Sequence, residues 1–172
     1  MPLKLLLSAV LWGAVAGATT SADPIHLCID YAAKVPAPAR AAFQQELRVL
    51  FQNQPLRFDR DSCGDKADIL LTVRDSRPLI PADALGLAAR EGQGIAGRLE
   101  IFLEPLLRAT GAGCWETFGR AMARVASHEL LHFLDQRAGH DEDGLFAPRL
   151  SHQLLVAEDA RPLLVARLSP AR

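Results

Sequence analysis

The segment at residues 128–132, which reads His-Glu-Leu-Leu-His, constrains this chain more than any other. On an α-helix, residues four positions apart lie on one face, so His128 and His132 can bind one metal ion from the same side. Glu129 lies about 100° further round the helix, where its carboxylate can hold a water activated by that metal. A third histidine, His140, follows eight residues after the second. The pattern is typical of a zinc hydrolase and requires this segment to be helical.

The residues before the motif indicate that its histidines face the interior. On a helical wheel, the apolar residues of the preceding turns share the side of His128, and they are Phe118, Ala121, Met122 and Val125. The opposite side is expected to be polar, with Glu116, Arg120, Arg124 and Ser127. Buried imidazoles and a buried carboxylate need partners, which favours a metal site over ordinary core histidines. We predict a helix from about Trp115 to about Gln136.

The N-terminus is typical of a secretory signal peptide. Lys4 supplies a positive charge, residues 5–18 form an apolar run, and small residues end at Ala18 and at Ala22. The run is short for a membrane span, although an uncleaved anchor is an alternative. We therefore predict a signal peptide over residues 1–22 and a secreted or periplasmic location.

The rest of the chain, residues 23–172, is predicted to form a single domain. The formal net charge is −1 and no basic run occurs, so the sequence offers no case for nucleic acid as a partner. After cleavage of the signal we expect no stable association with a membrane. We expect the protein to be a monomer.

Three cysteines permit one disulfide in an oxidising compartment. Cys28 lies in a predicted strand and can simply be buried. Cys63 and Cys114 lie in loop-like stretches, so we predict that these two residues form the disulfide.

Periodicity and turn residues predict an α+β (mixed α/β) domain with a small mixed sheet and two main helices. The predicted strands span residues 25–31, 56–58, 68–73 and 99–103. The first main helix is the one predicted over about 115–136, which carries the motif and is called the metal helix below. The second spans about 38–53, and further helical stretches are predicted at 150–156 and 160–168. Residues 84–90 fit neither pattern, Pro105 is expected to end a strand, and residues 109–113 are expected to form a loop.

Residues 128–146 resemble the metzincin clan of zinc peptidases, whose motif HExxHxxGxxH is followed by a methionine turn. Here the third histidine comes two residues later, a spacing that is similar to small secreted bacterial metzincin-like proteins with HExxHxxxxxxxH. The triplet Gly144-Leu145-Phe146 lies where Gly-Ile-Met is expected. The chain departs from the pattern at Leu131, which replaces a glycine, at Asp141, which replaces a serine, and at Phe146, which replaces the methionine.

The resemblance implies one Zn²⁺ ion bound by His128, His132 and His140, with Glu129 as the general base. Asp141 and Glu158 are the rivals of His140 as third ligand. Two other acids, Asp135 and Asp143, could orient the ligand imidazoles. The Phe146 side chain would form an apolar floor beneath the metal.

The leading interpretation is a zinc metallopeptidase that hydrolyses peptide bonds with a zinc-activated water, and its partner would be a peptide or protein substrate. If the strand around Leu99–Leu103 is the edge of the sheet over the cleft, an extended peptide could pair with it. Two alternatives remain: a catalytically weak or inactive zinc-binding protein that binds a partner, and a zinc amidase acting on cell-wall peptides.

Overall fold

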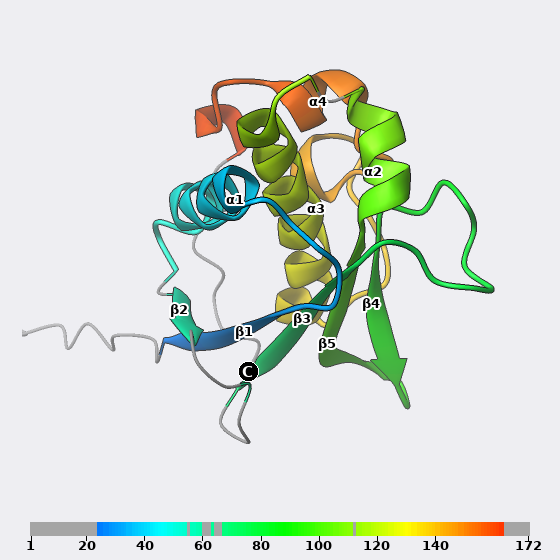
Figure 1. The fold of residues 1–172 in the computed structure, drawn as a ribbon. Helices are drawn as coiled ribbons and strands as arrows, with labels where there is room; N and C mark the ends of the chain where they lie inside the picture. Colours follow the sequence, from blue (N-terminus) through cyan, green and yellow to red (C-terminus); the bar gives the residue numbers. More distant parts are fainter. Residues whose placement is uncertain (1–23, 55, 60–62, 64–66, 112, 164–172) are drawn as a thin grey trace, which may run out of the picture.

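One five-stranded sheet with helices packed on one face forms the computed structural model (Figure 1), which describes residues 24–54, 56–59, 63, 67–111 and 113–163. The strands are β1 (Ile25–Tyr31), β2 (Leu56–Asp59), β3 (Ile69–Arg74), β4 (Gly86–Glu91) and β5 (Gly94–Phe102). The helices are α1 (Ala37–Leu50), α2 (Leu103–Thr110), α3 (Trp115–Asp135) and α4 (His152–Val156). Two short 3₁₀ helices, η1 (Gly144–Phe146) and η2 (Arg161–Leu163), lie in the C-terminal part. The predicted α+β class is confirmed.

The order of the strands is β2-β1-β3-β5-β4. All neighbouring strands are parallel except β4, which runs antiparallel to β5 and forms one edge of the sheet. Residues 99–103 therefore do not form the edge, which was the condition for pairing a peptide with them, because β4 covers that side of β5. Leu87 of β4 is in register with Glu100 of β5.

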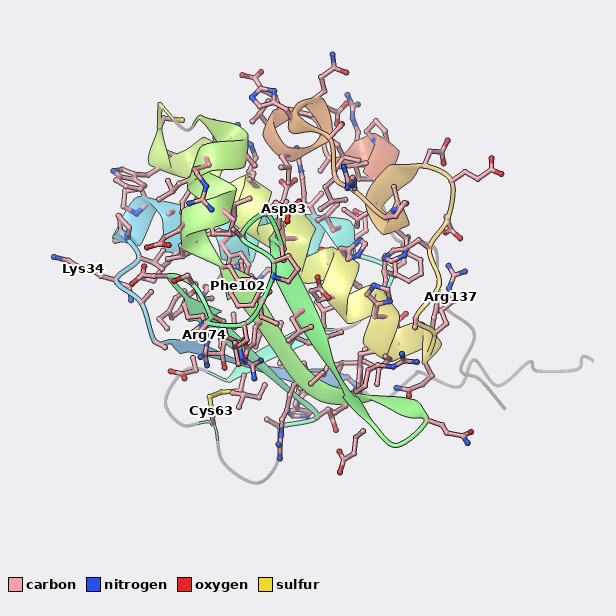
Figure 2. The ribbon with its side chains drawn as sticks, turned by 90° about the vertical axis from the view of Figure 1, so that its right-hand side faces the viewer. Lys34, Cys63, Arg74, Asp83, Phe102 and Arg137 are labelled. Carbon is pink, nitrogen blue, oxygen red and sulfur yellow. A yellow bond between two sulfur atoms is a disulfide. The ribbon has the colours of Figure 1, made fainter. Side chains whose placement is uncertain are left out.

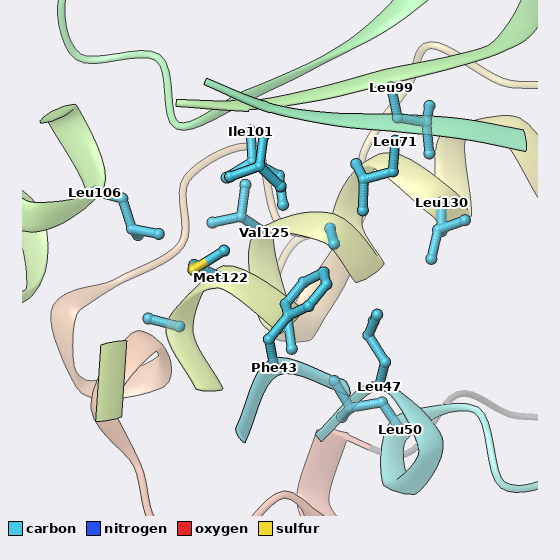
Figure 3. Packing of buried hydrophobic residues seen from close by; sticks show 14 of the residues in the cluster. Phe43, Leu47, Leu50, Leu71, Leu99, Ile101, Leu106, Met122, Val125 and Leu130 are labelled. Atoms are coloured by element: carbon cyan, nitrogen blue, oxygen red, sulfur yellow. The ribbon is translucent and has the colours of Figure 1, made fainter. Parts of the chain in front are cut away.

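The hydrophobic core fills the space between the sheet and the helices α1 and α3 (Figure 3). Alternate residues of β3 and β5 point toward the helices, among them Leu71, Leu99 and Ile101, all at most 1% exposed. They meet Phe43 of α1 and Val125 of α3 in the same cluster. The apolar side predicted for the metal helix is thus confirmed as its buried side.

Helix α3 packs closely against α1 at Gly119. A side chain at this position would collide with the backbone carbonyl of Ala39, so only glycine permits this approach. The close contact lets α1 cover the flank of α3 that carries Gly119.

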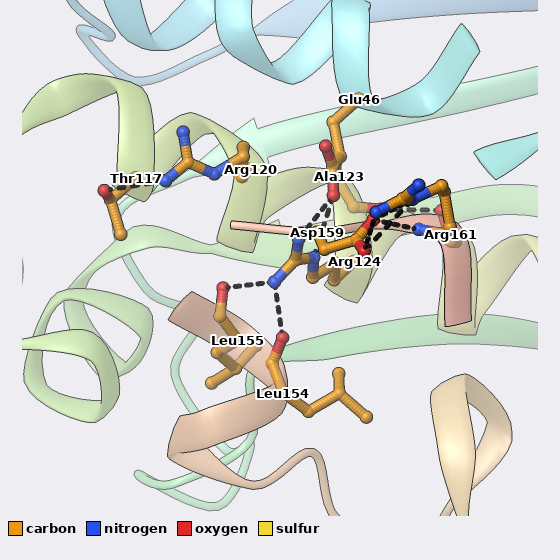
Figure 4. Close-up of polar contacts among 10 residues, drawn as sticks. Glu46, Thr117, Arg120, Ala123, Arg124, Leu154, Leu155, Asp159 and Arg161 are labelled. Atoms are coloured by element: carbon orange, nitrogen blue, oxygen red, sulfur yellow. Dashed lines mark hydrogen bonds and ion pairs between the residues drawn. The ribbon is translucent and has the colours of Figure 1, made fainter. Parts of the chain in front are cut away.

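The expected polar side of the metal helix is therefore partly buried, which corrects the prediction for Arg124 and Ser127. The Arg124 guanidinium donates to the Glu46 carboxylate of α1 at 2.7 and 2.9 Å, and also to the carbonyls of Leu154 and Leu155 (Figure 4). This fully buried arginine joins α1 and α4 to the helix that carries the motif.

The disulfide joins Cys28 to Cys63, and Cys114 is a free, exposed thiol (Figure 2 labels Cys63). The predicted pair Cys63–Cys114 was wrong. Because β2 pairs with β1, the chain after β2 brings Cys63 to Cys28, with the two Cα atoms 5.4 Å apart. The Cys114 side chain instead caps α3 by accepting from the backbone N–H of Thr117.

The predicted signal peptide and most of the helix predicted at 160–168 lie outside the described residues. Among the described helices, none combines the length and hydropathy needed to cross a membrane.

Candidate metal centre

The three histidines predicted as ligands lie together in the structure. Helix α3 carries His128 and His132 one turn apart, and their Nε2 atoms are 3.2 Å from each other. His140 lies on the connection after α3, and one ligand atom from each of the three imidazoles falls within 4.8 Å of the others. The two helical histidines are buried, whereas His140 is exposed. This cluster could hold a metal ion.

Backbone carbonyls fix the orientation of the two helical imidazoles. The Nδ1 atom of His128 lies 3.0 Å from the carbonyl oxygen of Leu145, and Nδ1 of His132 lies 2.8 Å from that of Arg137. A carbonyl can only accept a hydrogen bond, so each Nδ1 carries the proton and each Nε2 keeps a lone pair for a metal. Such bonds to the far nitrogen are usual around metal-binding histidines.

Two of the three imidazoles, those of His128 and His140, have pKa values shifted toward the neutral form that a metal ligand requires. Burial lowers the pKa of His128 to about 4, and its neighbours His132 and His140 add to that effect. The pKa of His140 is also lowered, first by partial burial and then by the charges of His132 and Arg137.

An apolar floor lies against all three rings. The Phe146 ring centroid is 5.5 Å from that of His128, 4.7 Å from His132 and 5.6 Å from His140. Phe146 is only 4% exposed. The Arg137 guanidinium carbon lies 4.4 Å from the centroid of the same ring. The place expected of Phe146 beneath the cluster is confirmed, because η1 brings it there.

The carboxyl group of Glu129 lies between the metal helix and the edge strand. Glu129 is 6% exposed, and burial raises the pKa of its carboxyl to about 8, against the opposing effect of a hydrogen bond from the backbone of Ala88 in β4. Gly86 of β4 makes room for it: a Cβ there would lie 2.7 Å from Oε1 of Glu129. A cation bound by the neighbouring imidazoles would favour the carboxylate form.

These groups line a cleft of about 530 Å³ between β4 and α3. One wall is β4 with the residues just before it, and the other wall is the segment around Pro148–Leu150. His128, Glu129 and His132 line the cleft together with His140. The volume falls in the range of sites for small ligands or for a few residues of a peptide.

The donor set is one that a metal ion can use. Three imidazole nitrogens lie within 4.8 Å of one another, and imidazole suits zinc, copper, iron or nickel. The rivals of His140 are not in the cluster. Asp141 bonds Arg137 instead, and Glu158 is exposed after α4.

Some partners of the site differ from those the sequence suggested. Asp135 pairs with Arg137 rather than orienting an imidazole, and the two carbonyls take that role. A carbonyl carries no residue-specific signal, so the motif could not reveal these partners. Arg149, which the motif does not include, also lines the cleft.

Comparison of the chain with protein-family models and with curated proteins found no match.

Proposed function

We propose that this protein is a zinc metallopeptidase whose active site is the cleft between β4 and α3. The observation that carries the proposal is the convergence of three imidazoles beside a buried carboxyl group that lines the same cleft. Nitrogen-only ligation by three histidines is one of the sets that catalytic zinc uses, and it leaves one position open. When bound, zinc would act as a Lewis acid that lowers the pKa of water and polarises a carbonyl.

In this proposal Glu129 is the general base. Its carboxylate accepts a proton from the attacking water and returns the proton to the leaving nitrogen of the substrate. The lack of a side chain at Gly86 leaves room for the carboxyl group, and the hydrogen bond from the backbone of Ala88 holds it there against the cleft. His128 and His132 hold their Nε2 atoms toward the same space through their bonds to carbonyls.

The geometry favours an extended peptide as substrate. β4 is the edge strand of the sheet and also a wall of the cleft, and its outer side pairs with no strand in the described part of the chain. An unpaired edge offers backbone N–H and C=O groups that a peptide can pair with. Such pairing would lay a peptide bond of the substrate alongside Glu129.

We also propose that the protein is exported after removal of residues 1–22, on the basis of the charged, apolar and small-residue order of that segment. Mass spectrometry of protein recovered from the periplasm or medium should give an N-terminus after Ala18 or Ala22. An intact chain beginning at Met1 would contradict export with cleavage.

The test of the activity is hydrolysis of casein and of a quenched-peptide library by the zinc-loaded protein. Glu129→Gln should retain zinc and lose activity about 10²–10⁴-fold, because glutamine cannot accept the proton. Glu158→Gln is the matched control, since Glu158 is exposed and outside the histidine cluster, and it should keep full activity.

The other outcomes separate the alternatives. Tight zinc binding without cleavage of casein or of the peptide library, but with cleavage of cell-wall peptides, would favour an amidase. Tight binding without any hydrolysis would favour a zinc-binding protein that serves a partner. Equal activity of the wild type and Glu129→Gln would show that the motif is not the active site.

A further inference from the structure

Arg137, the second residue after α3, contacts several parts of the metal centre at once, and Figure 2 shows its side chain on that connection. Its backbone carbonyl oxygen accepts from Nδ1 of His132 at 2.8 Å. Its guanidinium donates to Oδ1 of Asp141 at 3.0 Å, and its Nε lies 3.3 Å from Oδ2 of Asp135. The same guanidinium covers the ring of Phe146 at 4.4 Å.

These contacts link the helical ligands to the loop ligand. Asp141 directly follows His140, so the ion pair with Arg137 restrains the backbone that carries the third imidazole. The backbone N–H of Asp141 also donates to the carbonyl of Phe146 at 3.0 Å, which ties the loop to the floor of the site. The planar guanidinium can bond a carboxylate and stack on a ring at once, which a lysine ammonium cannot do as well.

Arg137 also bonds Asp141, whose carboxylate could compete with His140 for the metal. Asp141 is a carboxylate one residue from His140, and carboxylates bind zinc as well as imidazoles do in many sites. In the structure, however, Asp141 does not belong to the convergent cluster, and one of its oxygens bonds Arg137. The bond thus keeps a carboxylate away from a set of three nitrogens.

We propose that Arg137 is a positioning residue that selects His140 rather than Asp141 as the third metal ligand. The inference rests on the metal-binding part of the proposed function and does not require catalysis. It also implies a metal preference, because three imidazoles suit zinc, whereas a carboxylate in the set improves binding of harder ions such as Mn²⁺.

The test is a double-mutant cycle read out as zinc and Mn²⁺ affinity, measured by competition with a chromophoric chelator. In the wild-type background, His140→Ala should weaken zinc binding more than about 100-fold, beyond the usual effect of an outer-shell residue. In the Arg137→Ala background the same change should cost at least about tenfold less, because Asp141 can now replace His140. Asp141→Asn should weaken zinc binding when it is added to Arg137→Ala, and it should have no such effect when Arg137 is present.

Two further variants control the cycle. Arg137→Lys keeps the charge but loses the planar fork, so its zinc affinity and its ratio of zinc to Mn²⁺ affinity should lie between those of the wild type and Arg137→Ala. Arg161→Ala removes an exposed arginine that pairs with Asp159, and zinc affinity should stay within about twofold.

The outcomes distinguish this inference from the function on which it rests. Equal costs of His140→Ala in both backgrounds, or an unchanged ratio of zinc to Mn²⁺ affinity in Arg137→Ala, would overturn the selection of His140 by Arg137 alone. A wild type that binds no metal would overturn the metal centre and with it the role of Arg137.

Discussion

The candidate metal centre has two halves that are built in different ways. His128 and His132 lie on α3, in the stretch Phe118–His132 where nearly every residue is buried between the sheet, α1 and the C-terminal segment. His140 lies on an exposed connection that is held by hydrogen bonds, ion pairs and the ring of Phe146. The first half is thus part of the core, whereas the second half depends on a few polar contacts. Changes in the helical half should therefore cost stability as well as metal affinity, and changes in the loop half should cost mainly metal affinity.

The largest effect is expected at Arg124, the buried anchor of the helical half. Arg124→Met leaves the Glu46 carboxylate buried without its partner, which typically costs about 3–5 kcal/mol of the free energy of unfolding. Urea denaturation of the metal-free protein measures this loss. Adding Glu46→Leu removes the stranded charge and should recover most of the stability. No loss of stability in Arg124→Met would show that the core does not depend on this ion pair.

The two kinds of ligand give the most direct comparison. His132→Ala and His140→Ala should each weaken zinc binding more than about 100-fold, because a lost ligand costs more than a lost outer-shell partner. Only His132→Ala should also destabilise the metal-free protein, by about 1–3 kcal/mol, since its ring is buried and bonded to a carbonyl. His140→Ala should change the free energy of unfolding of the metal-free protein by no more than about 0.5 kcal/mol, as substitutions of exposed residues usually do. Equal destabilisation by His132→Ala and His140→Ala would contradict the division of the site into a core half and a loop half.

Gly86→Ala tests the contact between the edge strand and Glu129, the proposed general base. The added Cβ would lie 2.7 Å from Oε1 of Glu129 and 2.9 Å from Cγ1 of Val125, so something must shift. Overpacking of this kind costs about 1–3 kcal/mol, and displacement of the carboxyl should lower the hydrolysis rate with little change in zinc affinity. Gly113→Ala, where a Cβ would meet nothing within 4 Å, is the control. Unchanged kinetics in Gly86→Ala would argue against a role of Glu129 at this position.

The smallest effect is expected from Phe146→Met, a change that keeps the floor apolar. Phe146 packs against the imidazoles without offering a ligand atom, so zinc affinity should fall less than about tenfold, below the usual effect of a lost hydrogen-bonding partner of a ligand. Most of that fall should come from the contact with Arg137, and Phe146→Met should therefore add little to Arg137→Ala. A loss above 100-fold would mean that the aromatic ring does more than pack beneath the cluster.

The same division explains what the sequence could reveal. The helical half follows from local spacing, since i and i+4 residues share a face and the apolar residues before them mark the buried side. His140 lies against Phe146 and next to Asp141, which bonds Arg137, and only the resemblance to a known family suggested that it joins the site. The carbonyls that orient His128 and His132 have no signature in the sequence at all.

The sequence did not predict β4, α2 or the correct disulfide, and each of these failures has a physical reason. The β4 segment reads Gly-Leu-Ala-Ala-Arg-Glu, without β-branched residues, and its strand form comes from pairing with β5. Pro105 was expected to end a strand, but it lies in the first turn of α2, where a missing N–H costs nothing. The disulfide depends on the pairing of β2 with β1, which brings Cys63 to Cys28 from a distant part of the chain.

The central claim is that His128, His132 and His140 bind one metal ion together. The most direct measurement is zinc content of the purified protein together with zinc X-ray absorption spectroscopy. The account predicts one zinc per chain with three imidazole nitrogens at about 2.0–2.1 Å. A stoichiometry near zero, or a first shell in which a carboxylate replaces the third imidazole, would contradict it.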